Sequence, residues 1–242
     1  MTLRILVNGA TGRMGRLTVS TLQGEPDCVV AGETRSTDSL AEAIQQHAPD
    51  IVVDFTRADI AAANLTTILT AGACPVIGTS GLTHEDITAA RQRFPGRGGI
   101  IAPNFSIGAV LMMKYAGEMA RYFPDIEIIE MHHNGKLDSP SGTAIRTAEI
   151  LAGQRTLPPH TPKETQDIIQ GARGARHQDI PIHAVRLPGL VAHLQILFGS
   201  AGETLTFRHD SIDRQCFMPG VVLACRKVKS LNQLVYGLEH LL

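Results

Sequence analysis

The amino-acid sequence predicts an α/β protein, with a doubly wound parallel sheet and a smaller α+β region built on a mixed sheet. Three observations lead to this prediction. Strand-like and helix-like segments alternate from Leu3 to Ala102, and a glycine-rich turn joins the first strand to the first helix. A late segment, 181–208, is instead rich in alternating β-type residues, a pattern that predicts antiparallel strands. With 242 residues the chain can form one large domain or two small ones.

The first expected strand, 3–8, ends in a turn that reads Gly9-Ala10-Thr11-Gly12-Arg13-Met14-Gly15 and opens a helix to about residue 23. Glycine lets the backbone approach a pyrophosphate, and the free N–H groups at the start of a helix attract anions. A second strand, 28–32, ends at Glu33, whose carboxylate can bind ribose hydroxyls. The glycine spacing departs from G-x-G-x-x-G, and an ordinary strand–turn–helix unit is the alternative. We predict a Rossmann-type dinucleotide site.

The alternation then continues with clear helix starts, such as the Ser39/Glu42 capping box. The expected elements are a helix to residue 46, strand 51–55, helix 58–71, strand 75–78, a helix opened by Thr83 and Asp86, and strand 99–102. Ligands bind at the carboxyl ends of parallel strands. Three loops there are candidates, with routine turn chemistry as the alternative: Thr56-Arg57, Thr79-Ser80-Gly81 and Pro103-Asn104-Phe105-Ser106.

The second half has a different pattern. We expect a long helix at 107–123, a polar Pro- and charge-rich stretch at 156–178, and antiparallel strands within 181–208. Two apolar helices, 218–227 and 230–242, should return to cover the first domain, the second of them with a Ser230/Gln233 capping box. The expected domains are therefore 1–103 completed by 214–242, and 104–213.

The stretch from Glu130 to Ala144 concentrates the chemistry of the chain: E-M-H-H-N-G-K-L-D-S-P-S-G-T-A. It is predicted to be a loop between strand 126–130 and a helix. His132 or His133 can donate a proton, Lys136 is a fixed cation, and the N–H groups of Gly142 and Thr143 start a helix. An anionic substrate that needs a proton would suit it.

This stretch also has two other interpretations. Adjacent histidines are often solvated or capping residues, and S-P-S-G-T is a common helix start. His132, His133 and Asp138 are metal-ligand types, but neighbours on a strand point to opposite faces and the usual ligand spacings are missing, so no metal is predicted.

Composition narrows the partners. A formal net charge of −1 gives no footprint for nucleic acid or an acidic membrane surface, so a small molecule is the expected partner. Four scattered cysteines fit reduced thiols. The chain shows neither a signal-peptide pattern nor an apolar run of membrane length, and we expect a cytoplasmic protein.

Over its whole length the sequence resembles the 4-hydroxy-tetrahydrodipicolinate (dihydrodipicolinate) reductase family. The most specific motif is H-H-x-x-K-x-D-x-P-S-G-T-A; G-A-T-G-R-M-G, D-F-T, G-T-S-G and P-N-F-S-I-G support it. The resemblance implies a reductase of the diaminopimelate branch of lysine synthesis, with NADH or NADPH as the hydride source and no metal. It also implies a Rossmann-type domain, a second domain for substrate and oligomerisation, a dicarboxylate substrate and a homotetramer.

The resemblance also implies roles for individual residues. By this resemblance, His132 would be the general acid, and Lys136 would act in catalysis and in substrate binding. The other substrate contacts are His133, Ser80, Ser141, Gly142 and Thr143. The cofactor contacts are Gly9, Gly12, Arg13, Met14, Glu33, Arg35, Phe55, Thr56, Gly78, Ser80, Asn104 and Phe105.

Two departures from the family pattern bear on the cofactor. Members often have an arginine directly after the glutamate, but here Thr34 follows Glu33 and the arginine is Arg35, while Ser80 stands where threonine is more usual. Cofactor choice therefore stays open at this point. Two other functions also stay open: a Rossmann reductase of another small anion, such as an amino-acid dehydrogenase, and a non-catalytic nucleotide sensor.

Overall fold

A computed structural model describes residues 2–79, 81–160 and 167–242, and it divides the chain into two compact units. The first unit comprises residues 1–107 and 214–242, and the second comprises residues 108–213. Ser80, a predicted ligand contact, lies outside the described residues.

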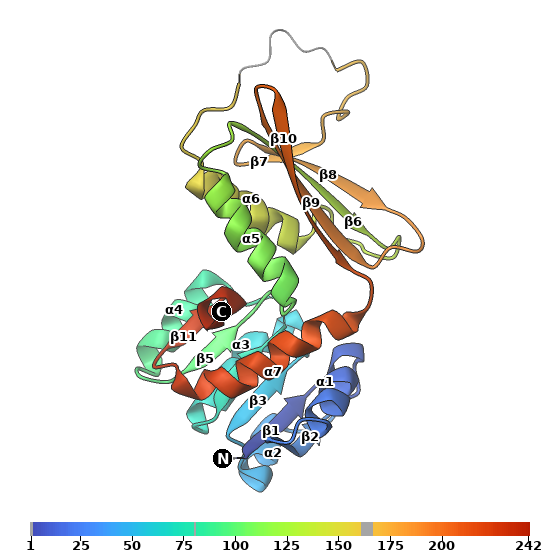
Figure 1. The fold of residues 1–242 in the computed structure, drawn as a ribbon. Coiled ribbons are helices and arrows are strands. Elements are labelled where there is room, and N and C mark those ends of the chain that lie inside the picture. Colours follow the sequence, from blue (N-terminus) through green and yellow to red (C-terminus); the bar gives the residue numbers. More distant parts are fainter. Residues whose placement is uncertain (1, 80, 161–166) are drawn as a thin grey trace. The chain divides into compact units, whose positions relative to one another are not determined.

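The first unit is built on a six-stranded sheet in the order β11-β5-β4-β3-β1-β2 (Figure 1), and every strand pair in it is parallel. The strands are β1 (Leu3–Asn8), β2 (Cys28–Thr34), β3 (Ile51–Asp54), β4 (Cys74–Ile77), β5 (Gly99–Ile101) and β11 (Leu234–Tyr236). Most of β1, β3 and β4 is fully buried, as expected for strands covered on both faces. The expected doubly wound sheet is confirmed.

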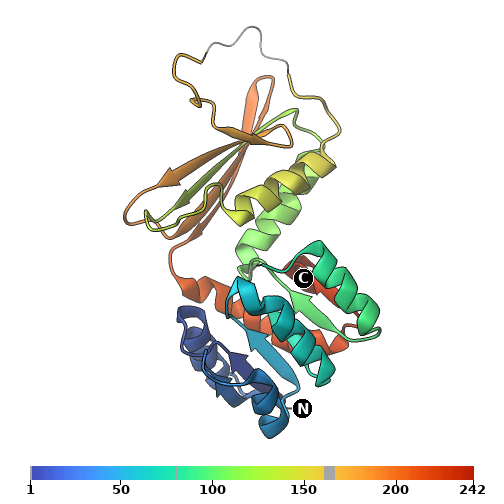
Figure 2. The same cartoon turned by 180° about the vertical axis from the view of Figure 1, so that it is seen from behind.

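Helices cover both faces of this sheet (Figures 1 and 2). One face carries α1 (Arg13–Gln23) and α7 (Met218–Lys227), which pack on each other. The other face carries α2 (Leu40–His47), α3 (Ala61–Thr70) and α4 (His84–Arg93) in a row, and a short 3-10 helix, η1 (Ala58–Ile60), leads into α3. The caps predicted for α2 and α4 are present: Ser39 accepts from the N–H of Glu42, and Thr83 and Asp86 form a full capping box.

The C-terminal segment differs from the prediction of a helix over 230–242. Residues 234–236 form the edge strand β11, paired with β5, and a short 3-10 helix, η4 (Leu238–Leu241), follows. The Ser230 hydroxyl donates backwards to the Lys227 carbonyl, at the end of η3 (Val228–Ser230), so it does not cap a new helix. Leu234 and Val235 are buried within this strand. Tertiary packing therefore overrides the helical spacing of apolar residues in this segment.

The second unit has a mixed five-stranded sheet in the order β10-β9-β6-β8-β7. Its strands are β6 (Asp125–His132), β7 (Ala175–His177), β8 (Ile180–Arg186), β9 (Ala192–Ser200) and β10 (Glu203–Ser211). The 181–208 segment was expected to be antiparallel, and β9 with β10 is, but β8 pairs parallel to β6. A parallel pair needs a long crossover, and α6 (Gly142–Gln154) with the polar stretch after it supplies one.

The core of the second unit lies between one face of its sheet and the helices α5 (Ile107–Met119) and α6 (Figure 2). Met112 and Ala116 of α5 and Ala148 and Leu151 of α6 pack on strand residues that include Ile128. Within the described ranges no helix covers the opposite face, which presents the odd-numbered side chains of β6.

The first unit ends four residues later than the boundary that the sequence suggested. Phe105 is buried, and its ring meets that of Phe55 edge to face at 5.8 Å. A Cβ at Gly220 of α7 would lie 2.0 Å from the Phe105 carbonyl oxygen, so the 103–106 loop packs tightly within this unit.

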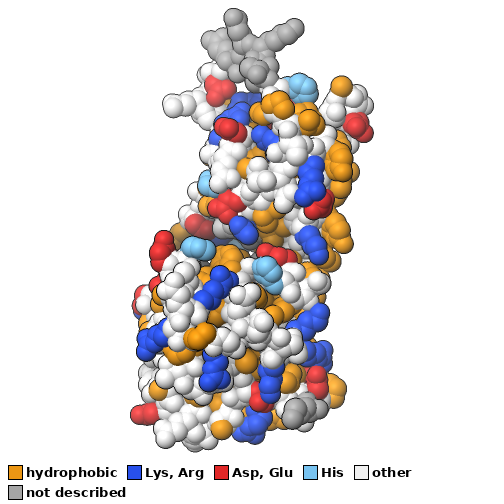
Figure 3. Space-filling model, turned by 90° about the vertical axis from the view of Figure 1, so that its left-hand side faces the viewer, with side chains coloured by type: hydrophobic (Ala, Val, Ile, Leu, Met, Phe, Trp, Pro, Cys, Tyr) orange, Lys and Arg blue, Asp and Glu red, His pale blue; other side chains and the backbone are white. Residues whose placement is uncertain are grey.

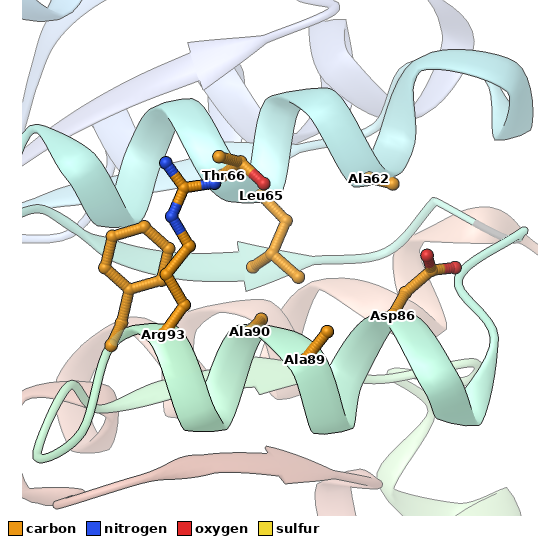
Figure 4. A pocket seen from close by; sticks show the side chains of 8 residues that line it. Ala62, Leu65, Thr66, Asp86, Ala89, Ala90 and Arg93 are labelled. Carbon is orange, nitrogen blue, oxygen red and sulfur yellow. The ribbon is translucent and has the colours of Figure 1, made fainter.

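Figures 3 and 4 show two other parts of the surface. On the face in Figure 3, basic side chains are scattered among acidic and uncharged ones. A small pocket between α3 and α4 (Figure 4) is lined by Leu65, Thr66, Arg93 and other side chains, none of them a predicted site residue. Among the residues described, no helix is long and apolar enough to cross a membrane, and no cluster of three or more metal-ligand side chains occurs.

Candidate active site

The glycine turn lies at the carboxyl end of β1, whose neighbours β2 and β3 lie on opposite sides of it. Ligands of open α/β sheets bind at such a reversal of strand order. Gly9 has φ +84°, and a Cβ there would lie 2.8 Å from the Phe55 carbonyl oxygen. A Cβ at Gly15 would lie 2.1 Å from the Gly9 carbonyl oxygen. Side chains at either position would force the turn and α1 apart.

The start of α1 fits the pyrophosphate of a dinucleotide. Gly12 is the N-cap and makes no side-chain capping bond, and the first turn has no acidic residue. The exposed Arg13 adds a positive charge there, and Met14 is half-buried. Backbone N–H groups and a cation therefore face a position where an anion is favoured.

A buried hydrogen-bond network, which sequence reasoning missed, links the strand ends beneath this turn. The carboxylate of Asp54, the last residue of β3, is fully buried and accepts hydrogen bonds from Asn8, Thr56, Asn64 and Thr79 at 2.6–3.0 Å. The predicted cofactor contact Thr56 thus has its hydroxyl on Asp54. An aspartate at the end of a buried strand is the signal that the sequence offered.

Phe55 and Gly78 pack together beside the 103–106 loop. A Cβ at Gly78 would lie 2.1 Å from Cε1 of Phe55, so glycine makes room for the ring. Phe55 in turn contacts the Phe105 ring, while the side-chain oxygen of Asn104 accepts the Ser106 N–H at 2.8 Å. The structure therefore brings four predicted cofactor contacts of three loops together.

The end of β2 presents Glu33 and Arg35 to solvent, but Thr34 between them points inward. Thr34 is 1% exposed, and its hydroxyl donates to the Asn8 side-chain oxygen at 2.6 Å. Its carbonyl accepts the N–H groups of Gly9 and Ala10. Thr34 therefore anchors the glycine turn and offers nothing to a ligand.

In the second unit, His132 is the last residue of β6. From the sequence alone, His132 is predicted to lie in the loop that follows the strand. Its side chain is 14% exposed, and its Nδ1 lies 2.5 Å from Oε2 of Glu130. Strand alternation places the two side chains on one face of the sheet, two residues apart. Since Glu130 occupies Nδ1, Nε2 is the ring nitrogen free to serve a ligand.

Glu130 and Arg186 were not predicted as site residues, yet they lie at the centre of this site. Glu130 is fully buried; its two oxygens accept from Arg186 at 2.7 and 3.0 Å, and Oε1 also accepts the Ser141 N–H at 3.3 Å. Burial would raise the pKa of this carboxyl, but the bonds from His132 and Arg186 outweigh it, so the pKa of Glu130 is lowered. Arg186 is 56 residues away in sequence, and no local signal pairs it with Glu130.

Lys136 lies in the loop that follows. Its Nζ donates to both oxygens of Asp138, at 2.7 and 2.8 Å, and this bond lowers the pKa of Asp138. The Lys136 N–H is held by the carbonyl of His133, whose own side chain is half-buried. The predicted cation thus has a partner, which an incoming anion would have to share or displace.

The predicted substrate contacts at the start of α6, Ser141, Gly142 and Thr143, differ in their surroundings. Ser141 is buried, its hydroxyl accepts the Ala144 N–H at 3.2 Å, and its own N–H donates to Glu130. Gly142 is exposed, and a Cβ there would meet nothing within 4 Å; Thr143 is half-buried beside it. The N–H groups of Gly142 and Thr143 are the ones open to a ligand anion.

A parallel sheet with a dinucleotide turn, in a chain that also carries this histidine site, defines an NAD(P)H-dependent oxidoreductase of the Rossmann class. Two family sequence models cover nearly all of the chain: "Dihydrodipicolinate reductase, N-terminus" matches residues 3–105, and "Dihydrodipicolinate reductase, C-terminus" matches residues 108–242. The chain belongs to the dihydrodipicolinate reductase family.

Relatives agree over their full lengths. The chain is 50% identical over 244 aligned positions to the 4-hydroxy-tetrahydrodipicolinate reductase of Legionella pneumophila (strain Lens), and 48% identical to that of Coxiella burnetii (strain RSA 493 / Nine Mile phase I); each alignment covers 100% of both proteins. Among solved structures, a dipicolinate-bound dihydrodipicolinate reductase from Paenisporosarcina sp. TG-14 is 39% identical, with a TM-score of 0.90 and 100% coverage of both chains. An engineered D-amino acid dehydrogenase bound to NADP+ has a TM-score of 0.56 at 15% identity, a likeness of fold alone.

Proposed function

We propose that this protein reduces 4-hydroxy-tetrahydrodipicolinate to tetrahydrodipicolinate with NAD(P)H, in the diaminopimelate branch of lysine synthesis. The observation that carries the proposal is one site with a histidine, a lysine and an open helix start, in a chain similar over its whole length to a dipicolinate-bound reductase. A heterocyclic dicarboxylate needs two anion contacts and one proton donor. The second unit offers all three.

The family resemblance and the geometry of the site together support the proposed roles. Lys136 and the N–H groups of Gly142 and Thr143 hold the substrate carboxylates, and His133 helps to hold the ring. When bound, the reduced nicotinamide supplies the hydride. The proton comes from Nε2 of His132, while Nδ1 stays on Glu130. In the first unit, the 9–15 turn holds the pyrophosphate and Glu33 the ribose.

One assay tests the function. Purified protein is mixed with enzymatically generated substrate and NADH or NADPH, and the absorbance of the reduced cofactor is followed. We expect a steady, substrate-dependent decrease. A protein that binds NADH and leaves it unchanged would be a sensor, and oxidation with an oxo acid and ammonia in place of this substrate would indicate an amino-acid dehydrogenase.

Cofactor choice gives a second test. The exposed carboxylate of Glu33 suits a free 2′-hydroxyl and repels a 2′-phosphate, and buried Thr34 cannot offset that repulsion. Arg35 is the nearest cation in sequence, with its N–H held by Asp38 at 2.8 Å. We expect NADH to be preferred and NADPH tolerated. Arg35→Ala should raise KM for NADPH more than for NADH, whereas Arg16→Ala on the exposed side of α1 should affect both little. Equal losses in Arg35→Ala would remove Arg35 from the site.

The Lys136–Asp138 pair predicts a gain of affinity. In Asp138→Asn, Lys136 loses its charged competitor, and binding of pyridine-2,6-dicarboxylate should tighten by about two- to five-fold, the scale of a solvent-exposed ion pair. Titration calorimetry measures this constant directly, and Asp59→Asn in the first unit is the matched control. Weaker binding in Asp138→Asn would mean that Asp138 orients Lys136 toward the ligand.

We also propose a homotetramer that buries the helix-free face of the second sheet. Ile129, Met131 and Val185 lie on this face by strand alternation, and Val185 is 37% exposed. Apolar side chains on an uncovered sheet face are typical of subunit contacts. Sedimentation should show a tetramer, Val185→Lys should shift it to smaller species, and Val29→Lys on the other unit should not. A monomeric wild-type protein would contradict the proposal.

A further inference from the structure

The buried carboxylate of Glu130 bonds to three residues from different parts of the second unit. Its Oε2 holds Nδ1 of His132 at 2.5 Å, and both oxygens hold the two Nη atoms of Arg186. Arg186 Nη2 also donates to the carbonyl of Asp138 at 2.7 Å, and Ser141 donates its N–H to Oε1. One carboxylate thus joins the strand end, the 133–141 loop and the start of α6.

The bond to Nδ1 decides which ring nitrogen reacts. An ionised carboxylate is an acceptor only, so Nδ1 must carry a hydrogen in both the neutral and the protonated ring. The second proton of the imidazolium therefore lies on Nε2. It leaves from Nε2, and the ring stays anchored while it does so.

Arg186 reduces the effect of the negative charge of Glu130 on the His132 ring. A buried carboxylate alone would hold the imidazolium strongly, because opposite charges attract more in a low dielectric. The fork of Arg186 neutralises much of that attraction through two bonds to Glu130. The ring can then release its proton more readily than it would beside a lone carboxylate.

We propose that Glu130 and Arg186 are positioning residues for proton transfer: Glu130 fixes Nε2 of His132 as the donor atom, and Arg186 limits how tightly Glu130 retains the imidazolium. This inference rests on the proposed function, in which His132 protonates the substrate. Neither residue is required to touch the substrate.

Other charged or titratable groups of this unit lie on the loop after β6, on α6 and on neighbouring strands. Lys136 and Asp138 of the loop neutralise each other, and the first charged residue of α6, Arg146, pairs with Glu149. Ala192, across from His132 on β9, is uncharged. His133 directly follows His132 in the chain. His209 belongs to β10, two strands away from β6, and lies against Gly108 of α5. The charges bonded closest to the ring are thus Glu130 and, through it, Arg186.

Opposite substitutions should therefore act in opposite directions. Glu130→Gln removes the negative charge and leaves Arg186, so the alkaline limb of the kcat–pH profile should move to lower pH. Arg186→Met leaves a lone carboxylate beside the ring, and the limb should move up. Arg186→Lys keeps the charge and should stay near the wild type, as should the matched control Arg146→Met. At neutral pH, Glu130→Gln should lower kcat by about 10–100-fold, less than loss of the donor itself, with KM little changed.

Nitrogen-15 NMR of histidine-labelled protein gives a readout that does not depend on turnover. The His132 signal is identified by its loss in His132→Gln. In the wild type the neutral ring should be the Nδ1–H form, and its titration should shift down in Glu130→Gln and up in Arg186→Met. Glu130→Gln keeps the shape of the side chain. If Arg186→Met does not fold, the His132 titration in Glu130→Gln still tests the proposal. An unchanged or upward titration in Glu130→Gln, or shifts of the same sign in both variants, would overturn the proposal.

A double-mutant comparison separates this inference from the function on which it rests. If Glu130 acts through His132, Glu130→Gln should add little to the loss already present in His132→Gln. A full additional loss would show that Glu130 acts elsewhere. By contrast, a wild-type protein that does not turn over the substrate, while its His132 titration still responds to Glu130→Gln and Arg186→Met, would sink the proposed function and leave the positioning intact.

Discussion

His132→Gln should lower kcat by about 10²–10⁴-fold, the range for loss of a positioned general acid. The physical reason is that, among the described residues of this site, His132 is the one whose ring is anchored through Nδ1 and whose Nε2 has no hydrogen-bond partner among them. Affinity for NADH should hardly change, because the proposed cofactor contacts belong to the other unit. Steady-state kinetics with generated substrate, and NADH titration by fluorescence, measure the two quantities.

The neighbouring histidine is the matched control for this variant. His133→Gln should act mainly on KM, since His133 is assigned to holding the substrate. If His132→Gln keeps most of its kcat, the proton comes from Lys136 or from water, and the assignment of the donor is wrong.

Lys136→Ala should weaken competitive inhibition by pyridine-2,6-dicarboxylate by roughly 1.5–3 kcal/mol, the scale of a hydrogen bond to a charged group. This planar dicarboxylate has no reducible imine, so it reports binding without turnover. Thr143→Ala should have a smaller effect, because its main-chain N–H at the start of α6 remains. Inhibition constants measured against the substrate decide both cases.

Lys114→Ala, at an exposed position of α5, controls for the loss of one positive charge. Its inhibition constant should match that of the wild type. An inhibitor that does not compete with substrate, or a Lys136→Ala variant with an unaltered inhibition constant, would count against the dicarboxylate assignment and favour another small anion.

Much of the fold could be predicted because its signals are local. The alternation of strands and helices, the caps at Ser39 and Thr83, and the turn after β1 each depend on residues within one or two helical turns of each other. The same holds for the cluster that runs from His132 to Thr143, where neighbours in sequence are also neighbours in space. The resemblance to a reductase family rests on these local motifs, and the family comparison confirms it.

Other features depend on partners that the sequence does not announce. A short apolar segment such as 234–236 forms a strand or a helix according to what packs beside it, and here β5 decides for a strand. The parallel pairing of β8 with β6 was likewise set by the crossover and not by the alternation of residues within β8.

By itself, the sequence determined the class of fold, the place of the glycine turn after the first strand, and the resemblance to a reductase family. Only the tertiary structure decided that Thr34 is turned inward on Asn8 and that Arg186 meets Glu130. The physical reason is burial. A charge or hydroxyl removed from water must find a partner, and which partner it finds depends on strand order and packing across 26 or 56 residues of chain.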